Sequence, residues 1–345
     1  MALAALWALC VGCAPASPPV PARRAPAPGP VHSSPRPAPP PSANAPIHDA
    51  GSDGATDAAP SRVAFPPPAF KPSVERTAAD GDGSWAPLSP GTAGMVRTVV
   101  HPHAFKKFVY VAIVAIDLDR VGVKLVAGTQ EPESKRVPRD QRSGLVPAAE
   151  QSRLLAVFNG GFKARHGGYG MAVGSHVFLL PRTDHSCTVA LYDRRVRIGR
   201  FSELEHAGLA AWRQTPPCLA RQGQPSADLD NAWKRRRWGM NAKGKRDIRR
   251  SAVGTRDGGR VLLYGLGEWV TPRGLARAML AAGADDVAEL DINWSYTRFI
   301  LFGASADGGP PSVSGTLIPE IKHRPGEYVS RPSTRDFFYL VQRAD

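Results

Sequence analysis

Prolines are distributed very unevenly along this chain, and their distribution limits where a fold can form. Of the 34 prolines in 345 residues, 20 lie between Pro15 and Pro90. That segment is also rich in Ala, Ser and Gly and has no apolar periodicity, so it cannot bury enough surface to offset its ordering entropy. We therefore predict a disordered linker over residues 14–91. We predict a single folded domain over residues 92–345, which is long enough for a sizeable core.

The first 13 residues, MALAALWALCVGC, form a short apolar run that ends at Cys13. The run is too short to span a bilayer as a helix, and it lacks the basic start of a standard signal peptide. It resembles a bacterial lipoprotein signal in which Cys13 would carry the lipid, although Cys10 stands where Leu is usual. We predict an exported protein, either periplasmic or secreted, or held at the membrane through Cys13.

Two further cysteines, Cys187 and Cys218, are an even pair in a chain predicted to be exported. They could form a disulfide or remain as two buried thiols, and their spacing is not that of a metal site.

The net charge of +14 is concentrated in residues 233–250, WKRRRWGMNAKGKRDIRR. Because these charges do not form a helical stripe, they favour a solvated loop or a surface for anionic glycans or phosphates over a nucleic-acid site.

Strand-like runs dominate the predicted domain. The polar turn 117–120 suggests that the first two strands pair as a hairpin, and Asp257-Gly258-Gly259 predicts another hairpin. The clearest helix is Pro272–Ala282, with Thr271 as its cap and Gly283 at its end. We predict an α+β fold: a mixed, mainly antiparallel β-sheet with a few packed helices. The principal elements expected are strands at Phe108–Leu118, Gly122–Ala127, Leu154–Phe158, Met171–Leu180, Thr188–Tyr192, Val196–Phe201, Ser251–Thr255, Arg260–Tyr264 and Val287–Ile292, and a short helix at Leu145–Arg153.

One candidate binding site follows the apolar run Leu154–Phe158, which stops at Asn159-Gly160-Gly161. A strand that ends in an amide and two glycines can present backbone N–H groups to a ligand, because glycine permits unusual conformations and close approach. A tight turn without a ligand fits the same residues. Just beyond, His166 could supply a proton and Tyr169 could stack on a sugar, although a lone His in a Gly-rich loop also fits simple exposure.

A second candidate site lies on the predicted strand Val287–Ile292. Alternation places Ala288, Leu290 and Ile292 toward the core and puts Glu289, Asp291 and Asn293 together on the other face. Two carboxylates at this spacing suit acid–base chemistry, because their repulsion raises one pKa, or they could ligate a hard divalent cation, which the sequence does not require. A solvated edge face is the alternative. The aromatic residues Trp294 and Tyr296 follow at once and favour a site, because such rings stack on sugar or base faces.

Five segments follow one another along the chain: Asn159-Gly160-Gly161-Phe162, Gly170–Gly174, Arg250-Ser251-Ala252-Val253-Gly254, the helix Leu275–Ala282 leading to Leu290-Asp291, and Arg331–Val341. Taken in this order, they resemble the phosphodiester glycosidase domain over roughly residues 108–343. The resemblance implies hydrolysis of a glycosidic bond in a phosphodiester-linked or related glycan. Asp291 would be the nucleophile or acid–base residue, with Glu289 as its partner.

The same resemblance implies that Asn159, Gly160, Gly161 and Arg250 bind the anionic group, with Asn293, Trp294 and Ser295 beside them. Arg250 could equally be one more charge in a basic loop. The family's Asp-Gly-Gly-Gly-Ser is here Asp291-Ile292-Asn293-Trp294-Ser295, which removes three glycines. Two hypotheses follow: an exported hydrolase, or a surface-tethered module that binds glycans in the same cleft without cleaving them. Both depend on residues near 160 and 290 lining one pocket.

Overall fold

The structure, a computed structural model, describes residues 64–89, 92–305 and 307–344. The predicted lipoprotein-like segment with Cys13, and most of the predicted linker, lie outside these residues. Residues 64–89 of the predicted linker are part of the fold, since Phe65, Phe70 and Trp85 pack against buried core residues. Within the described residues, neither helix has the length and apolar character needed to cross a membrane.

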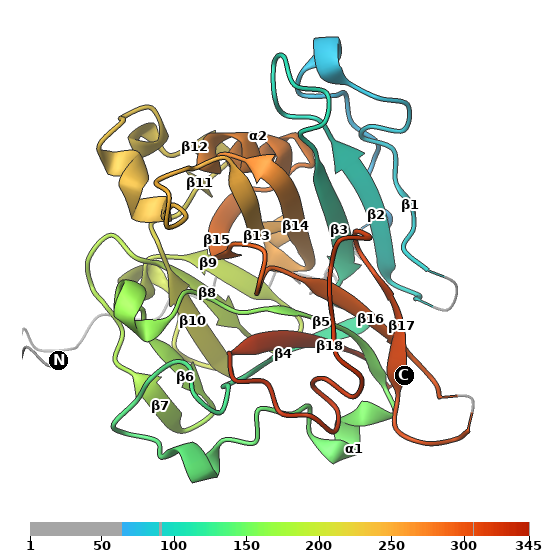
Figure 1. Cartoon of the computed structure of the whole chain (residues 1–345), viewed down its shortest axis with the longest axis vertical. Helices are drawn as coiled ribbons and strands as arrows, with labels where there is room; N and C mark the ends of the chain where they lie inside the picture. Colours follow the sequence, from blue (N-terminus) through green and yellow to red (C-terminus); the bar gives the residue numbers. More distant parts are fainter. Residues whose placement is uncertain (1–63, 90–91, 306, 345) are drawn as a thin grey trace, which may run out of the picture. The chain divides into compact units, whose positions relative to one another are not determined.

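Three sheets make up the fold, and every strand pair in their ladders is antiparallel (Figure 1). The predicted α+β class with a mainly antiparallel sheet is therefore confirmed, and the strands are divided among three sheets. The largest contains, in spatial order, β1 (Ala86–Pro87), β2 (Met95–Val100), β3 (Val111–Asp117), β14 (Val261–Val270), β13 (Ile248–Arg256), β15 (Asp286–Ile292), β11 (Ala220–Arg221) and β12 (Gln224–Pro225).

The other two sheets have five strands each. One contains β7 (His176–Leu179), β6 (Met171–Val173), β10 (Ala211–Thr215), β8 (Cys187–Leu191) and β9 (Val196–Gly199), and the other contains β17 (Ser312–Thr316), β16 (Phe299–Gly303), β5 (Leu154–Asn159), β18 (Phe337–Gln342) and β4 (Val121–Val126). The described α-helices are α1 (Ala148–Gln151) and α2 (Pro272–Ala281). Short 3₁₀ turns occur at Glu75–Thr77, Arg139–Gln141, Ala164–His166, Phe201–Glu203, Ala227–Leu229, Lys234–Trp238 and Asp257–Gly259.

The central strands β3, β13, β14 and β15 of the eight-stranded sheet are largely buried on both faces, which explains the nearly unbroken apolar run of β3. On β3, Val114 and Ile116 face the central core that all three sheets share, while Ile113 and Ala115 pack on the opposite face in the cluster that includes α2. The helix begins as predicted, because Thr271 Oγ1 accepts a hydrogen bond from the Gly274 N–H at 3.1 Å. Helix α2 therefore covers one face of the sheet and leaves the other to the core.

The predicted hairpin of the first two strands is wrong. Strand β3 pairs with β2 and β14, whereas β4 pairs with β18 in a different sheet. The turn between them is a corner at which the chain passes from one sheet to another, and the Leu118 N–H donates to the Arg260 carbonyl at 3.0 Å. A short polar turn between two apolar runs fits either arrangement, so the sequence pattern could not distinguish them. The hairpin at Asp257-Gly258-Gly259 is confirmed by the pairing of β13 with β14.

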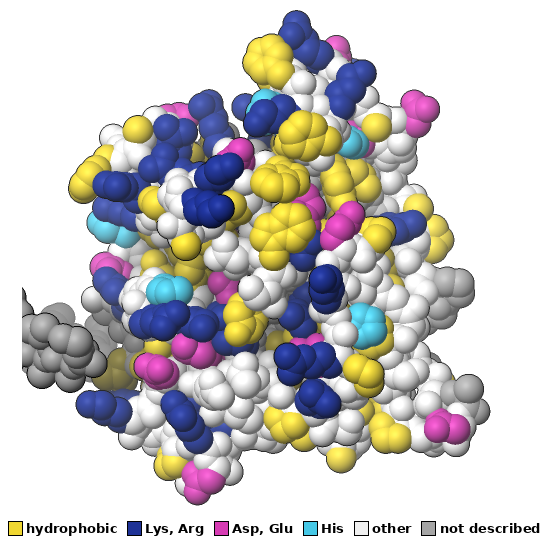
Figure 2. All heavy atoms as spheres, in the orientation of Figure 1, with side chains coloured by type: hydrophobic (Ala, Val, Ile, Leu, Met, Phe, Trp, Pro, Cys, Tyr) yellow, Lys and Arg dark blue, Asp and Glu magenta, His cyan; other side chains and the backbone are white. Residues whose placement is uncertain are grey.

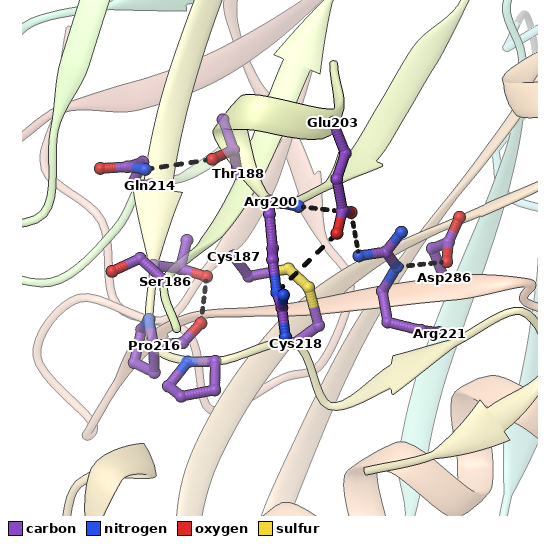
Figure 3. The surroundings of a disulfide bond; sticks show 12 residues. Ser186, Cys187, Thr188, Arg200, Glu203, Gln214, Pro216, Cys218, Arg221 and Asp286 are labelled. Atoms are coloured by element: carbon purple, nitrogen blue, oxygen red, sulfur yellow. Dashed lines mark hydrogen bonds and ion pairs between the residues drawn. A yellow bond between two sulfur atoms is a disulfide. The ribbon is translucent and has the colours of Figure 1, made fainter. Parts of the chain in front are cut away.

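The two cysteines that the sequence left open are joined by a disulfide, Cys187–Cys218 (Figure 3). It connects the start of β8 with the segment that leads into β11, and so fastens one five-stranded sheet to the edge of the eight-stranded sheet. Beside it, Arg221 bridges Glu203 at 2.9 Å and Asp286 at 3.0 Å. This edge of the molecule is therefore held by one covalent bond and a chain of ion pairs.

Candidate functional site

The glycine corner at the end of β5 is built around a carboxylate that the sequence analysis did not select, Asp336. The Gly160 N–H donates to the Asp336 carbonyl at 3.0 Å, and the Gly161 N–H donates to Asp336 Oδ2 at 2.9 Å. A Cβ at Gly160 would overlap Asp336 Oδ2, and a Cβ at Gly161 would lie 2.9 Å from Arg213 Cζ. Neither glycine has a positive φ. These positions therefore require glycine for close packing, and both N–H groups already have a partner.

Asn159 is buried and connects three strands. Its Oδ1 accepts hydrogen bonds from the Tyr264 hydroxyl at 2.9 Å and from the Arg298 N–H at 3.1 Å. Its Nδ2 donates to Ser251 Oγ at 2.9 Å, and Ser251 Oγ donates in turn to the Asp291 carbonyl at 3.0 Å. The amide that was predicted to face a ligand is thus used by the protein itself, and it fixes β5 against β13, β14 and β15.

The two predicted stretches meet directly. The Asp291 N–H donates to the Gly160 carbonyl at 3.1 Å, so the acidic end of β15 lies against the glycine corner. Asn159, Gly160, Gly161, Asp291 and Ser295 line one cavity. Arg335 and Asp336, from the segment just before β18, complete the same wall.

Asp291 is one of three carboxylates that line this cavity, with Glu327 and Asp336, and it is only 6% exposed. Its Oδ1 accepts a hydrogen bond from the Ile292 N–H at 2.9 Å, and its Oδ2 pairs with Arg335. Burial disfavours the charged form and raises the pKa of Asp291 to about 6, against the opposing effect of Arg335. The side chain can therefore hold or release a proton near neutral pH.

Glu289, two residues earlier, is sealed inside the protein. It is 0% exposed, and Arg250 Nη1 donates to its Oε1 at 2.7 Å. Arg250 also donates to backbone carbonyls, including those of Trp238 at 2.6 Å and Val270 at 3.1 Å. Burial raises the pKa of Glu289 to about 7, although the adjacent Arg250 favours the charged form. Neither Glu289 nor Arg250 lines the cavity, so a substrate there would not touch either side chain.

Two irregularities in strand pairing shape this end of the eight-stranded sheet. Strand β13 pairs with β14 on one side and with β15 on the other. β14 has one extra residue opposite Ile248–Arg250 of β13, and β15 has one extra residue opposite Arg250–Ala252 of β13. Such bulges bend a strand and redirect its side chains. The predicted alternation holds for Ala288 and Leu290, which lie in the central core, and fails for Ile292, which packs in a separate cluster with Phe162 and Ile248.

The cavity has a volume of about 340 Å³ and a basic mouth. Lys322, Arg324 and Arg331 are exposed on its rim, and their side chains form no ion pair with any residue that the structure describes. Deeper cations are neutralised: Arg298 pairs with Glu327 at 2.7 Å, and Arg335 pairs with Asp291. The site therefore offers free positive charge at its entrance and a buried carboxyl inside.

The remaining predicted residues lie outside the cavity lining. His166 is exposed, and its pKa is lowered by partial burial and by Arg165. Tyr169 packs edge-on against Phe162 and lines a different cavity of about 200 Å³, and burial raises its pKa to about 12. Asn293 and Trp294 follow β15 on the surface near the cavity.

Sequence reasoning named the segment Arg331–Val341 but did not select Arg335 or Asp336. Arg335 is bound to Asp291, and Asp336 accepts a 2.8 Å hydrogen bond from the buried Arg213. The sequence did carry a signal for these two residues, because a charged pair stands immediately before the apolar strand FFYLVQ and charged residues are rarely buried without a purpose.

Among residues 64–89, 92–305 and 307–344, no group of three or more His, Cys, Asp or Glu side chains is arranged to hold a metal ion.

A larger cavity of about 680 Å³ lies elsewhere, between β4 and the sheet that contains β6 and β7. Its walls include Leu125, Phe178 and Val341, and none of the predicted site residues lines it. The smaller cavity is the better candidate for chemistry, because it alone of these two contains a buried carboxyl of raised pKa.

Comparison with known proteins gives likenesses of fold alone. No protein-family model matches the chain, and no curated protein matches it. The catalytic domain of zebrafish N-acetylglucosamine-1-phosphodiester alpha-N-acetylglucosaminidase, auto-inhibited by its pro-peptide, is similar at a TM-score of 0.45 and 13% identity, covering 75% of this chain and 87% of that chain.

Two more solved structures are similar at lower scores. A hypothetical protein from Synechocystis has a TM-score of 0.37 and 13% identity, covering 74% of this chain and 63% of its own, so this chain spans less than two thirds of it. A candidate exported protein from Burkholderia pseudomallei has a TM-score of 0.30 and 10% identity, covering 68% of this chain and 74% of its own. At such scores the function has to be inferred from the residues of the site.

Proposed function

We propose that the protein is a hydrolase that cleaves a glycosidic bond in an anionic glycan, such as a phosphodiester-linked sugar, with Asp291 as the acid–base residue. One observation carries the proposal: Asp291, with its pKa raised to about 6, lies in the wall of a cavity whose rim holds exposed cations with no ion-pair partner among the described residues. A general acid needs a pKa near the working pH, and burial is the usual way to supply it.

In this proposal the protonated Asp291 gives its proton to the leaving oxygen as the glycosidic bond breaks, and it recovers a proton from the water that completes the hydrolysis. Arg335 then stabilises the carboxylate that forms, because its guanidinium lies against Asp291. Lys322, Arg324 and Arg331 bind the anionic group of the substrate at the rim. Glu289 has no contact with substrate in this scheme and serves the site only by holding Arg250.

The choice of substrate class follows the motifs that resemble the phosphodiester glycosidase domain. Export, which the N-terminal sequence predicts, remains part of the proposal. The disulfide Cys187–Cys218 supports an oxidising compartment.

The test compares the full chain with Asp291→Asn on an aryl phosphodiester of N-acetylglucosamine 1-phosphate, following the release of free sugar. We expect Asn at this position to lower kcat by roughly 10²–10⁴-fold, the usual contribution of a general acid. Asp307→Asn is the matched control, because Asp307 is an exposed carboxylate on the β16–β17 loop outside the cavity. Equal turnover by wild type and Asp291→Asn would contradict the proposal.

A non-catalytic glycan-binding module is the second candidate. It is favoured by the segment Ile292-Asn293-Trp294, which replaces the three glycines of the family motif. The same assay separates the two candidates. A wild-type chain that retains anionic glycans without releasing any sugar would support the module and exclude the hydrolase.

A further inference from the structure

Two tryptophans form a corner on the surface beside the candidate site. Trp269 is 44% exposed and Trp294 is 49% exposed. Their ring centroids are 5.6 Å apart, and the ring planes meet at 72°. Figure 2 shows hydrophobic side chains gathered on this face of the molecule over the region of β3 and β14, with basic side chains around them. We call the pair the Trp269–Trp294 corner.

The backbone at the corner is held in conformations that bulky residues avoid. Trp269 has a φ of 53° and lies in the part of β14 that carries the extra residue opposite β13. Asn293, directly before Trp294, has a φ of 79°. Asn tolerates the left-handed region, whereas a bulky residue such as Trp269 is rare there, and such strain is typical of functional positions. Since both rings remain half in solvent, burial in the core does not account for this arrangement.

A buried ion pair holds the corner from behind. Arg249 is 1% exposed, and its guanidinium carbon lies 4.6 Å from the centroid of the Trp294 ring. The same guanidinium pairs with the buried Glu268, the neighbour of Trp269. The Arg249 carbonyl accepts a 2.9 Å hydrogen bond from the Asn293 N–H. Arg249 therefore covers one side of the Trp294 ring, and the Arg249–Glu268 pair holds the two tryptophans in a fixed position relative to each other.

The corner is continuous with the cavity through a single loop. Trp294 is followed by Ser295 and Tyr296, which both line the cavity, and it lies three residues after Asp291. The Tyr296 ring is itself fixed by Arg335, whose guanidinium carbon is 4.2 Å from the ring centroid. Because Trp294 directly precedes Ser295, the corner is adjacent along the chain to the cavity lining.

We infer that the Trp269–Trp294 corner is an outer subsite for a sugar ring, so that the preferred ligand is a glycan of at least two sugar units. The inference rests on the proposed function, because the charged unit occupies the cavity while an adjoining uncharged sugar stacks in the corner. Sugar rings have apolar C–H faces that stack on aromatic rings, and their hydroxyl groups stay in water. The two rings touch edge to face, so a sugar would stack on their solvent-exposed outer surfaces, which meet at 72°.

The test measures binding by calorimetry in the full chain, with Asp291→Asn in every variant to block turnover. The probes are N-acetylglucosamine 1-phosphate and the 1-phosphates of chitobiose and chitotetraose. We expect the longer probes to bind about tenfold more tightly than the single sugar. Trp269→Ala and Trp294→Ala should remove that preference for length and leave the affinity for the single sugar unchanged. Trp294→Phe should restore part of it.

Trp233→Ala is the matched control. Trp233 is 73% exposed, and Arg236 lies 4.7 Å from its ring centroid, so the same pairing occurs on a different surface. The inference is overturned if the three probes bind equally, if none of them binds, or if Trp233→Ala has the same effect as Trp294→Ala. The inference is also overturned if binding to vesicles of anionic lipid depends on these tryptophans while glycan binding shows no preference for length. Hydrolysis is assayed separately, so a chain that shows the length preference without turnover refutes only the proposed function.

Discussion

Two carboxylates stand two residues apart on β15, and each is paired with an arginine, yet they lie in different environments. Glu289 and Arg250 are both 0% exposed, and neither lines the cavity. Asp291 and Arg335 are 6% and 7% exposed, and both line it. The extra residue in β15 between positions 289 and 292 directs the two side chains into these separate surroundings.

The comparison teaches that a raised pKa does not by itself identify a catalytic group. Burial raises the pKa of both carboxyls, to about 7 for Glu289 and about 6 for Asp291. Only Asp291 combines that pKa with access to a space in which a substrate could lie. We therefore propose that the Glu289–Arg250 pair is structural and that the Asp291–Arg335 pair is functional. The predictions below test that division and the surroundings of the second pair.

The largest expected effect is the loss of folding stability when the Glu289–Arg250 pair, which is closed to solvent, is broken. Arg250→Ala removes the ion-pair partner of Glu289 and the donor to several buried carbonyls, which costs about 3–5 kcal/mol. Arg335→Ala, the matched variant of the open pair, should cost less, about 1–3 kcal/mol, because water in the cavity can hydrate Asp291. Urea unfolding measures both. Equal losses would mean that the two pairs do not differ in their access to water.

The next largest effect concerns Gly160, which packs on Asp336 beside the Asp291–Arg335 pair. Gly160→Ala would force a methyl group against Asp336 Oδ2 and should destabilise the fold by about 1–3 kcal/mol through overpacking. Gly315→Ala, in which the new Cβ would lie 3.6 Å from Leu301 Cδ1, is the control and should be close to neutral. Thermal unfolding compares them. A tolerated Gly160→Ala would show that the corner keeps glycine for a reason other than its packing on Asp336.

The pH dependence separates the two carboxyls. If Asp291 is the general acid, the rate should fall about tenfold per pH unit above its pKa of about 6, because the protonated form is lost. Glu289→Gln should leave this inflection in place. A rate profile whose inflection near 6 disappears in Glu289→Gln would assign the titration to the sealed residue.

Glu289→Gln should instead change the pH dependence of stability. The pKa of Glu289 rises from 4.5 to about 7 on folding, so the folded state holds an additional proton between these values. The free energy of unfolding therefore decreases as pH rises through this range. The variant should lose the part of this decrease that Glu289 causes, whereas the part due to Asp291, whose pKa rises from 3.8 to about 6, should remain. Denaturant unfolding at several pH values provides the measurement, and an unchanged slope would contradict the assignment.

The smallest effect is expected at the rim. Arg331→Ala removes one unpaired cation and should raise KM for an anionic substrate about two- to fivefold at low salt, with little change in kcat. The increase should diminish as salt is added. Arg197→Ala is the control, because Arg197 is exposed on β9 and does not line the cavity. Equal effects of the two variants would mean that the substrate responds only to net charge.

Local sequence was sufficient for the elements whose signals lie close together. Thr271, Pro272 and Gly283 delimit helix α2, and Asp257-Gly258-Gly259 joins β13 to β14, as predicted. The hairpin between β3 and β4 failed, because pairing partners more than 200 residues away, in β18, decided where β4 lies. For the site, the sequence indicated Asp291 and the glycine corner, but it could not indicate that Asp336 and Arg335 would join them from the end of the chain.

What the sequence by itself determined is the β-rich class of the domain and the residue types of the acidic strand and the glycine corner, because these depend on composition and on neighbours in the chain. It did not show that residues 64–89 of the proline-rich region pack into the fold. Only the tertiary structure decided that the Asp291 carboxyl opens to a cavity while that of Glu289 does not. The physical reason is that a single extra residue in β15, together with strands brought from distant positions, determines which buried charge is within reach of water.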